Sequence, residues 1–108
     1  MTDAQPTVAD AGDSYTITDG GEVAGFTRYV DSGNRRIFFH TEIEDRFAGR
    51  GLARTLVERA LDHTRGLGMR IVPVCPYVHG YVDRHHEFDD ALDPVTPEIL
   101  EIVRTSQY

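Results

Sequence analysis

The sequence has little of what several protein classes require. Its single cysteine, Cys75, excludes an intramolecular disulfide and a zinc site built on several cysteines. No stretch approaches the roughly 20 apolar residues that a membrane-spanning helix requires, and the N-terminus lacks the pattern of a signal peptide. Basic residues are outnumbered, since 18 Asp and Glu against 11 Lys and Arg give a net charge of −7. That charge repels nucleic acids and anionic membranes, so neither is an expected partner.

What is present suits one small domain in a reducing compartment such as the cytoplasm. The chain has 108 residues, enough for a single hydrophobic core. Residues 1–14 are small and acidic and are expected to form a flexible leader. Residues 15–92 carry the apolar patterns of the domain, and residues 93–108 are expected to form an extension with a short helix that begins at Pro97. No internal repeat or low-complexity block occurs.

The first half of the domain has the pattern of an antiparallel meander. Strands are predicted from Tyr15 to Thr18, over Glu22–Val30 and over Arg35–Ile43, separated by two Asp- and Gly-containing turn clusters. Alternation in the second strand predicts two faces, Ala24, Phe26 and Val30 on one, and Val23, Thr27 and Tyr29 on the other.

The second half has the pattern of a strand–helix–strand crossover. Helical spacing of apolar residues predicts an amphipathic helix that begins at Leu52 and ends near Gly66. A buried strand is expected over Met69–Cys75, and Pro76 is expected to open a second helix. The sequence therefore predicts an α+β fold with three layers and a mixed sheet.

The junction between the third strand and the first helix carries the strongest chemical signal. Gly49 and Gly51 remove side chains where backbone amides face a ligand, and the helix N-terminus attracts negative charge. Arg46 and Arg50 add cations that pair with phosphate oxygens. This pattern predicts a phosphate or pyrophosphate site, and the alternative is a loop that uses glycine only to turn the chain. Neither a Walker A loop nor a full dinucleotide fingerprint is present, since Arg54 stands where the third glycine of that fingerprint belongs.

The pattern Arg46-x-x-Gly49-x-Gly51 resembles the pyrophosphate-binding motif of the GNAT acetyltransferase superfamily. The resemblance covers Tyr15 to about Leu92 and implies a minimal GNAT-like fold that binds acetyl-CoA or coenzyme A. It implies that the coenzyme is held by Arg46, Phe47, Ala48, Gly49, Arg50, Gly51 and Leu52. It also implies that the sheet splays beyond Ile43, so that the pantetheine arm runs between two strands.

Flanking segments resemble the very small, NATD-type branch of this superfamily. These segments are His40-Thr41-Glu42-Ile43, Pro73-Val74-Cys75-Pro76-Tyr77-Val78 and Tyr81-x-x-x-His85-x-Glu87-Phe88-x-Asp90. The chain departs from that branch at His86 and Ala91, where relatives usually carry proline and leucine, and in its extension past Asp93. The departures bear on the acceptor side of the site and leave the pyrophosphate loop unchanged.

Three residues are the candidates for catalysis. Cys75 lies directly before a predicted helix N-terminus, where thiolates are stabilised, and is a candidate acetyl carrier; the alternative is a small buried apolar residue. His40 and Glu42 share a strand face and are the candidate general base for an amine acceptor. Tyr77 and Tyr81 rank below them as proton donors to the departing thiolate. The histidines near Cys75 do not match a zinc motif, so no metal site is predicted.

The leading hypothesis is an acetyl-CoA-dependent N-acetyltransferase acting on a small-molecule amine or a lysine. The acidic charge favours a cationic acceptor, and a partner or a second copy in a homodimer is a candidate for completing the acceptor pocket. Two alternatives remain at this stage. One is a coenzyme A-binding module with little or no catalysis, acting as a sensor or partner subunit, and the other is a hydrolytic or redox cysteine protein.

Overall fold

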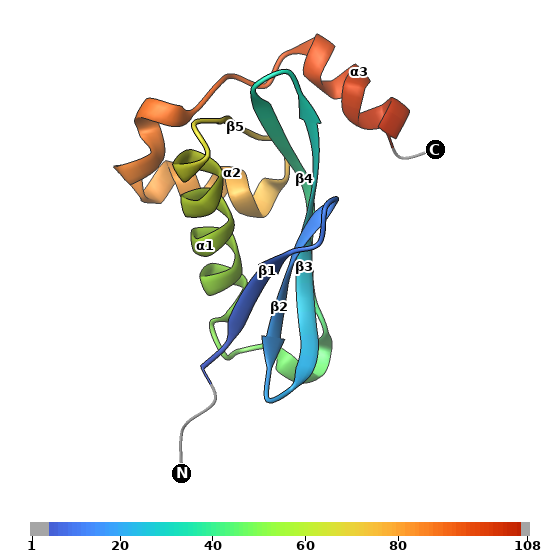
Figure 1. Ribbon diagram of the computed structural model, residues 1–108, viewed down its shortest axis with the longest axis vertical. Coiled ribbons are helices and arrows are strands. Elements are labelled where there is room, and N and C mark those ends of the chain that lie inside the picture. Colours follow the sequence, from blue (N-terminus) through green and yellow to red (C-terminus); the bar gives the residue numbers. More distant parts are fainter. Residues whose placement is uncertain (1–4, 107–108) are drawn as a thin grey trace.

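The computed structural model describes residues 5–106, which form one five-stranded sheet with helices on both faces (Figure 1). The strands are β1 (Thr7–Asp10), β2 (Ser14–Asp19), β3 (Glu22–Ser32), β4 (Arg35–Ile43) and β5 (Arg70–Pro73). The helices are α1 (Leu52–Gly66), α2 (Pro76–Arg84) and α3 (Pro97–Ser106), with short 3₁₀ turns η1 (Asp45–Phe47) and η2 (His86–Ala91). Strands β1 to β4 are antiparallel and β5 is parallel to β4, so the predicted mixed sheet and α+β class are confirmed. No helix within residues 5–106 is both long enough and apolar enough to cross a bilayer.

The N-terminal segment is more ordered than the sequence suggested. Residues 7–10 form β1, an edge strand paired with β2, so the expectation of a flexible leader is wrong for this stretch; residues 1–4 lie outside the described part. The Asp10 carboxylate accepts hydrogen bonds from the Tyr29 hydroxyl at 2.6 Å and the Gly12 amide at 2.9 Å. Burial raises the pKa of Asp10, but these hydrogen bonds and the Arg36 charge outweigh it and hold the pKa below its ordinary value. Main-chain pairing and these polar contacts order a segment that has few large apolar side chains.

Helix α1 forms where the apolar spacing predicts it. Its buried side packs on the sheet and consists of Leu52, Leu56, Val57, Ala60 and Leu61. The helix ends at Gly66. Two residues later Gly68 adopts φ 78°, a left-handed conformation that favours glycine and turns the chain toward β5.

Two apolar clusters lie on opposite sides of the sheet, which confirms the predicted three layers. Helices α1 and α2 pack on one side, and α3 lies on the other (Figure 1). On the α3 side, Ile37 and Val72 contact Ile99 and Val103. The Thr96 hydroxyl accepts a hydrogen bond from the Ile99 amide at 3.2 Å and so caps the N-terminus of α3, directly before Pro97.

Two β-bulges change which side chains share a face. Ala24 has no partner between the Ile17–Gly25 and Thr18–Val23 pairs, and Phe39 has none between the Arg28–His40 and Tyr29–Phe38 pairs. Each bulge reverses the alternation of its strand. The predicted faces of β3 are therefore partly wrong.

Ala24 lies with Tyr29 in the cluster under α1, although alternation placed the two on opposite faces. Val30 packs in the cluster under α3, away from Ala24. Hydrophobic alternation alone does not reveal a bulge, because one extra residue leaves the composition of the strand unchanged.

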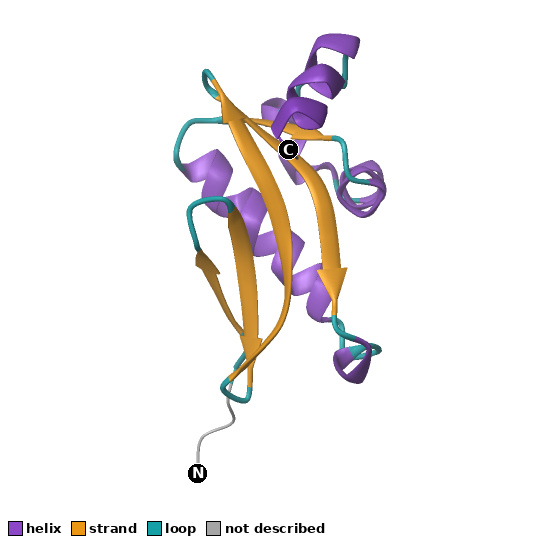
Figure 2. Cartoon of the chain, turned by 90° about the vertical axis from the view of Figure 1, so that its right-hand side faces the viewer, coloured by secondary structure: helices purple, strands orange, loops and turns teal. Residues whose placement is uncertain are grey.

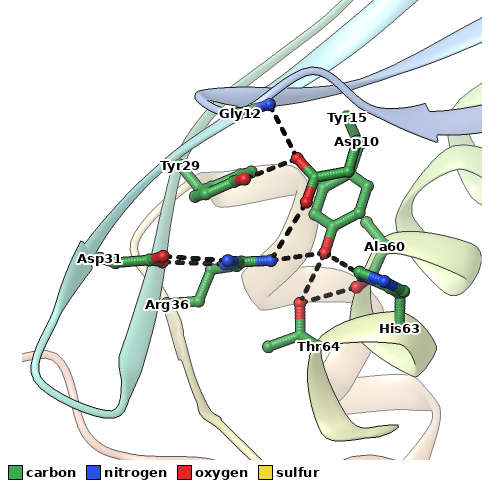
Figure 3. Close-up of polar contacts among 9 residues, drawn as sticks. All are labelled: Asp10, Gly12, Tyr15, Tyr29, Asp31, Arg36, Ala60, His63 and Thr64. Carbon is green, nitrogen blue, oxygen red and sulfur yellow. Dashed lines mark hydrogen bonds and ion pairs between the residues drawn. The ribbon is translucent and has the colours of Figure 1, made fainter. Parts of the chain in front are cut away.

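A buried polar network ties β2, β3, β4 and α1 together (Figure 3). The Arg36 guanidinium donates two hydrogen bonds to Asp31, at 2.8 and 2.9 Å, and one to the Tyr15 hydroxyl at 2.7 Å. It also lies 4.0 Å from the centre of the Tyr29 ring. The Tyr15 hydroxyl in turn lies 2.7 Å from Nδ1 of His63 on α1. All these groups are paired, so the network fixes the helix to the sheet at the end far from the glycine loop.

The segment after α2 is held to the edge of the sheet by one carboxylate. Asp93 accepts hydrogen bonds from Nε of Arg35 and Nε of Arg70, both at 2.8 Å. Arg70 also donates to the carbonyl oxygens of Asp90 and Leu92 at 2.9 Å. These contacts place the start of the C-terminal extension against β4 and β5.

Candidate functional site

Strands β4 and β5 diverge partway along β4 and leave one edge of β4 open. Their pairing ends at Phe38 and Pro73, and the amides of Val74 and Cys75 both donate to the Phe38 carbonyl, at 3.0 and 2.8 Å. The chain then turns into α2, while β4 continues to Ile43 with no partner strand from residues 5–106 on this side (Figure 2). The expected splay is therefore present but begins after Phe38 rather than beyond Ile43, since Pro73 lacks a main-chain donor and Pro76 begins a helix.

The bulge at Phe39 turns Thr41 toward the α1 side of β4, where Cys75 lies. The Cys75 thiol donates to the Thr41 hydroxyl at 3.3 Å, and Thr41 lies 2.9 Å from the hydroxyl of the fully buried Thr27. Cys75 is itself buried and caps the N-terminus of α2, with Pro76 in the first turn. These three groups form a short polar chain beside the open edge of β4.

His40 and Glu42 lie on the opposite face of β4 from Cys75. Nε2 of His40 lies 3.0 Å from Oε1 of Glu42, as expected for residues two apart on a strand, and both side chains are more than half exposed. The Phe26 ring packs beside His40, with the ring centres 5.9 Å apart. The structure therefore brings His40 and Glu42 together but does not place them next to the thiol.

The two candidate proton donors on α2 differ in environment. Tyr77 is exposed, whereas Tyr81 is buried and stacks on His85 with the ring centres 4.2 Å apart. Burial raises the pKa of Tyr81, the charges of Glu58 and Glu87 raise it further, and Arg54 partly offsets them. Tyr81 is therefore held protonated at neutral pH.

The glycine loop combines two left-handed residues with unpaired main-chain donors. Gly49 and Gly51 have φ of 82° and 74°, and Gly51 caps the N-terminus of α1. Within residues 5–106, no main-chain acceptor pairs with the N–H groups of Gly49, Arg50 and Gly51. A Cβ on either glycine would meet no neighbouring atom, so the backbone conformation, not crowding, requires glycine here.

Two amides that the sequence suggested for ligand binding are already engaged. The Phe47 amide donates to the Glu44 carbonyl at 2.9 Å, and the Ala48 amide donates to the Asp45 carbonyl at 3.1 Å. These bonds form the 3₁₀ turn η1, and the buried Phe47 ring anchors it. The available donors therefore begin at Gly49 and continue into the first turn of α1 at Leu52.

The arginine side chains of the loop are paired with carboxylates of the β2–β3 turn and with Glu44, which directly follows β4. Arg46 contacts Glu22 and Glu44, and Arg50 donates to Asp19 at 3.3 Å. Both guanidinium groups lie near the Phe47 ring, 4.8 and 5.2 Å from its centre. Arg46, Phe47 and Arg50 line a surface hollow of about 320 Å³ together with Asp19, Gly20 and Glu22 of the turn.

Gly25 supports this site and was not singled out from the sequence. A Cβ at Gly25 would lie 2.3 Å from the Glu42 carbonyl oxygen and 2.5 Å from the Ile43 side chain. Strand β4 therefore approaches β3 closely just before the loop, and the Glu44 amide donates to the Ala24 carbonyl at 2.8 Å. A glycine inside an otherwise alternating strand is the signal that points to such a close approach.

The histidines near α2 diverge. His79 lies 3.5 Å from Asp83, His86 lies 3.1 Å from Asp89, and His85 stacks on Tyr81. In the part of the chain that the structure describes, no three His, Cys, Asp or Glu side chains are grouped so as to hold a metal ion.

One family model matches the chain, and two solved structures share its fold. The family model described as GCN5-related N-acetyl-transferase matches residues 14–91. The NMR solution structure of a GCN5-like protein from Staphylococcus aureus has a TM-score of 0.65 at 16% identity, covering 90% of this chain and 95% of that one. The crystal structure of the ribosomal-protein-S18-alanine N-acetyltransferase from Escherichia coli has a TM-score of 0.51 at 18% identity, covering 57% of this chain and 42% of that one. A search of curated protein sequences finds no significant match. At these identities the two structures demonstrate a shared fold.

Proposed function

Because the chain belongs to the GCN5-related N-acetyltransferase family, we propose that it transfers an acetyl group from acetyl-CoA to an amine. The acceptor is a small-molecule amine or a lysine side chain. The reaction requires a site for the diphosphate of the donor, room for its thioester and a base for the acceptor amine. The free thiol of Cys75 suits a reducing compartment such as the cytoplasm.

The observation that carries the proposal is the set of unpaired N–H groups at the loop. Gly49, Arg50 and Gly51 present donors directly before α1, and the helix dipole adds positive potential at the same point. This cradle suits a diphosphate, since each phosphate oxygen accepts a main-chain hydrogen bond. Leu52 begins the helix behind it, and the Phe47 side chain fixes the loop in place.

The open edge of β4 offers the place for the thioester arm of the donor. In the part of the chain that the structure describes, main-chain groups between Phe39 and Ile43 have no strand partner on that side. Cys75 and Thr41 lie along this opening, and the hydroxyl of Tyr81 is the proton donor that we assign to the departing thiolate. The acetyl group would then lie close to the Cys75 thiol.

His40 and Glu42 are the general base in this proposal. Their exposed face of β4 is separate from the Cys75 side, so the acceptor amine approaches from the face opposite α1. The negative charge of the chain and the Glu42 carboxylate favour a cationic acceptor. A partner protein or a second copy of the chain is the candidate for closing the acceptor side.

The proposal is tested by measuring coenzyme binding and turnover with the same preparation. Calorimetry is expected to detect coenzyme A and acetyl-CoA, and thiol release is expected when a cationic amine is added to acetyl-CoA. Glu42→Gln is expected to lower turnover while leaving coenzyme affinity unchanged. The absence of binding at millimolar coenzyme A would disprove the proposal.

A second candidate function follows from the placement of the candidate base and the Cys75 thiol on opposite faces of β4. Because His40 and Glu42 lie on the other face of β4 from Cys75, a coenzyme A-binding module without catalysis also fits the loop geometry. Tight acetyl-CoA binding without thiol release over a broad amine panel, unchanged by Cys75→Ala, would establish that alternative.

A further inference from the structure

Three arginines occur at intervals of four residues around the glycine loop, namely Arg46, Arg50 and Arg54. The sequence pattern predicts that Arg46 and Arg50 pair with phosphate oxygens. In the structure their guanidinium groups have different surroundings from that of Arg54. The difference decides which side chain is free to bind an anion, since a guanidinium already paired with carboxylate must lose that contact first.

Arg46 and Arg50 join the loop to the β2–β3 turn. Arg46 contacts two carboxylates, Glu22 and Glu44, and these raise its pKa above the ordinary value. Arg50 pairs with Asp19 at 3.3 Å. Two carboxylates, Asp19 and Glu22, face the two guanidinium groups in this hollow, and Glu44 also contacts Arg46, so the local charge does not attract a phosphate.

Arg54 lies in the first turn of α1, on the same end of the helix as the unpaired amides. Its side chain is exposed and forms no ion pair with a carboxylate of residues 5–106. Its charge acts on the hydroxyl of Tyr81, which belongs to α2. Helix α2 begins at Pro76, directly after its cap Cys75, so Arg54, which acts on the Tyr81 hydroxyl, lies on the α2 side of α1.

We propose that Arg54 is the side chain that binds the diphosphate of the acetyl donor, and that Arg46 and Arg50 act instead as a clasp between the loop and the β2–β3 turn. This inference rests on the proposed function and adds to it a phosphate-binding residue outside the glycine motif. The main-chain donors of Gly49, Arg50 and Gly51 and the Arg54 cation would then approach the same anion from the end of α1.

The test is a calorimetric titration of coenzyme A into the wild type and four single variants, each at low and high salt. Arg54→Gln is expected to raise Kd at least tenfold and to flatten its dependence on salt, because one screened charge contact is lost. Arg54→Lys is expected to restore part of the affinity. Arg46→Gln is expected to raise Kd less than Arg54→Gln does, and Arg59→Gln, one turn further along α1, serves as the matched control and is expected to leave Kd unchanged.

The outcomes separate the two proposals. If Arg54→Gln changes Kd less than threefold, or if Arg46→Gln has the larger effect, the assignment to Arg54 is wrong although the proposed function stands. If the wild type does not bind coenzyme A, the proposed function fails and this inference fails with it. Circular dichroism and melting temperature of each variant establish that the changes in Kd come from folded protein.

Discussion

The Cys75 thiol donates a hydrogen bond to the Thr41 hydroxyl over 3.3 Å because β4 carries a bulge at Phe39. Without the extra residue, regular alternation would turn His40 and Glu42 toward the thiol and Thr41 away from it. One residue of backbone irregularity therefore decides which side chain of β4 contacts the cysteine. It also separates the candidate base from the candidate nucleophile.

Acetylation of the lone thiol is expected when the protein is incubated with acetyl-CoA in the absence of an amine. The Cys75 sulfur forms a bond to the acetyl carbon, the carbon–sulfur bond of the donor breaks, and the thiol proton passes to the sulfur of coenzyme A. Intact-mass measurement is expected to show one acetyl group on the wild type and none on Cys75→Ala. A wild-type mass that stays unmodified would indicate direct transfer to the acceptor.

Gly51→Asp is expected to abolish coenzyme binding. The substitution places a carboxylate at the anion cradle, and it also forces a residue with a Cβ into φ 74°, at a cost of about 1–2 kcal/mol. Gly33→Asp is the matched control, because Gly33 has φ 62° in the β3–β4 turn and has equally open surroundings. Calorimetry with coenzyme A distinguishes the two: equal affinities would show that the loop does not bind the diphosphate.

Gly25→Ala is expected to destabilise the protein by about 1–3 kcal/mol, as overpacking commonly does. The new Cβ would lie 2.3 Å from the Glu42 carbonyl oxygen, so β4 must move away from β3 directly before the loop. Coenzyme affinity is therefore expected to fall as well. Urea unfolding measures the first effect and calorimetry the second.

Gly80→Ala is the control for this prediction. Gly80 lies within α2, and a Cβ there meets no atom within 4 Å. The substitution is expected to leave stability unchanged or to raise it by up to about 1 kcal/mol, since alanine is the better helix former. A similar loss of stability in both variants would contradict the close approach at Gly25.

Removing the Asp93 carboxylate is expected to change how stability depends on pH. Hydrogen bonds from Arg35 and Arg70 hold the pKa of Asp93 below its ordinary value of 3.8, although burial opposes them. Because the folded state has the lower pKa, the carboxylate stabilises the fold above pH 3.8, and this contribution is lost as the pH falls below that value.

Asp93→Asn is therefore expected to melt at a lower temperature than the wild type at neutral pH, with the difference shrinking in acid. Asp62→Asn, which removes an exposed carboxylate with one ion pair at 3.3 Å, is the control and is expected to follow the wild-type curve. Melting temperatures over a pH series check this. A difference that is constant across the series would mean that the ionised form of Asp93 makes no special contribution.

The sequence by itself determined the order of the strands and α-helices from β2 onward, the three layers and the loop that carries the candidate site. Helix α1 and the cap at Thr96 follow from local patterns, because apolar spacing and capping residues act within a few positions along the chain. The left-handed conformations of Gly49 and Gly51 are likewise a local preference of glycine.

Only the tertiary structure decided how side chains from distant segments meet. The bulges at Ala24 and Phe39 decide which side chains of β3 and β4 share a face. Pairing with β2 orders residues 7–10, which have little apolar content. The carboxylates of the β2–β3 turn pair with Arg46 and Arg50. Register and ion pairing depend on contacts between separate elements, and the free energies of these contacts are small individual differences that no local pattern encodes. For that reason the glycine loop could be recognised from the sequence, whereas the side chains around it that are free to bind an anion could not.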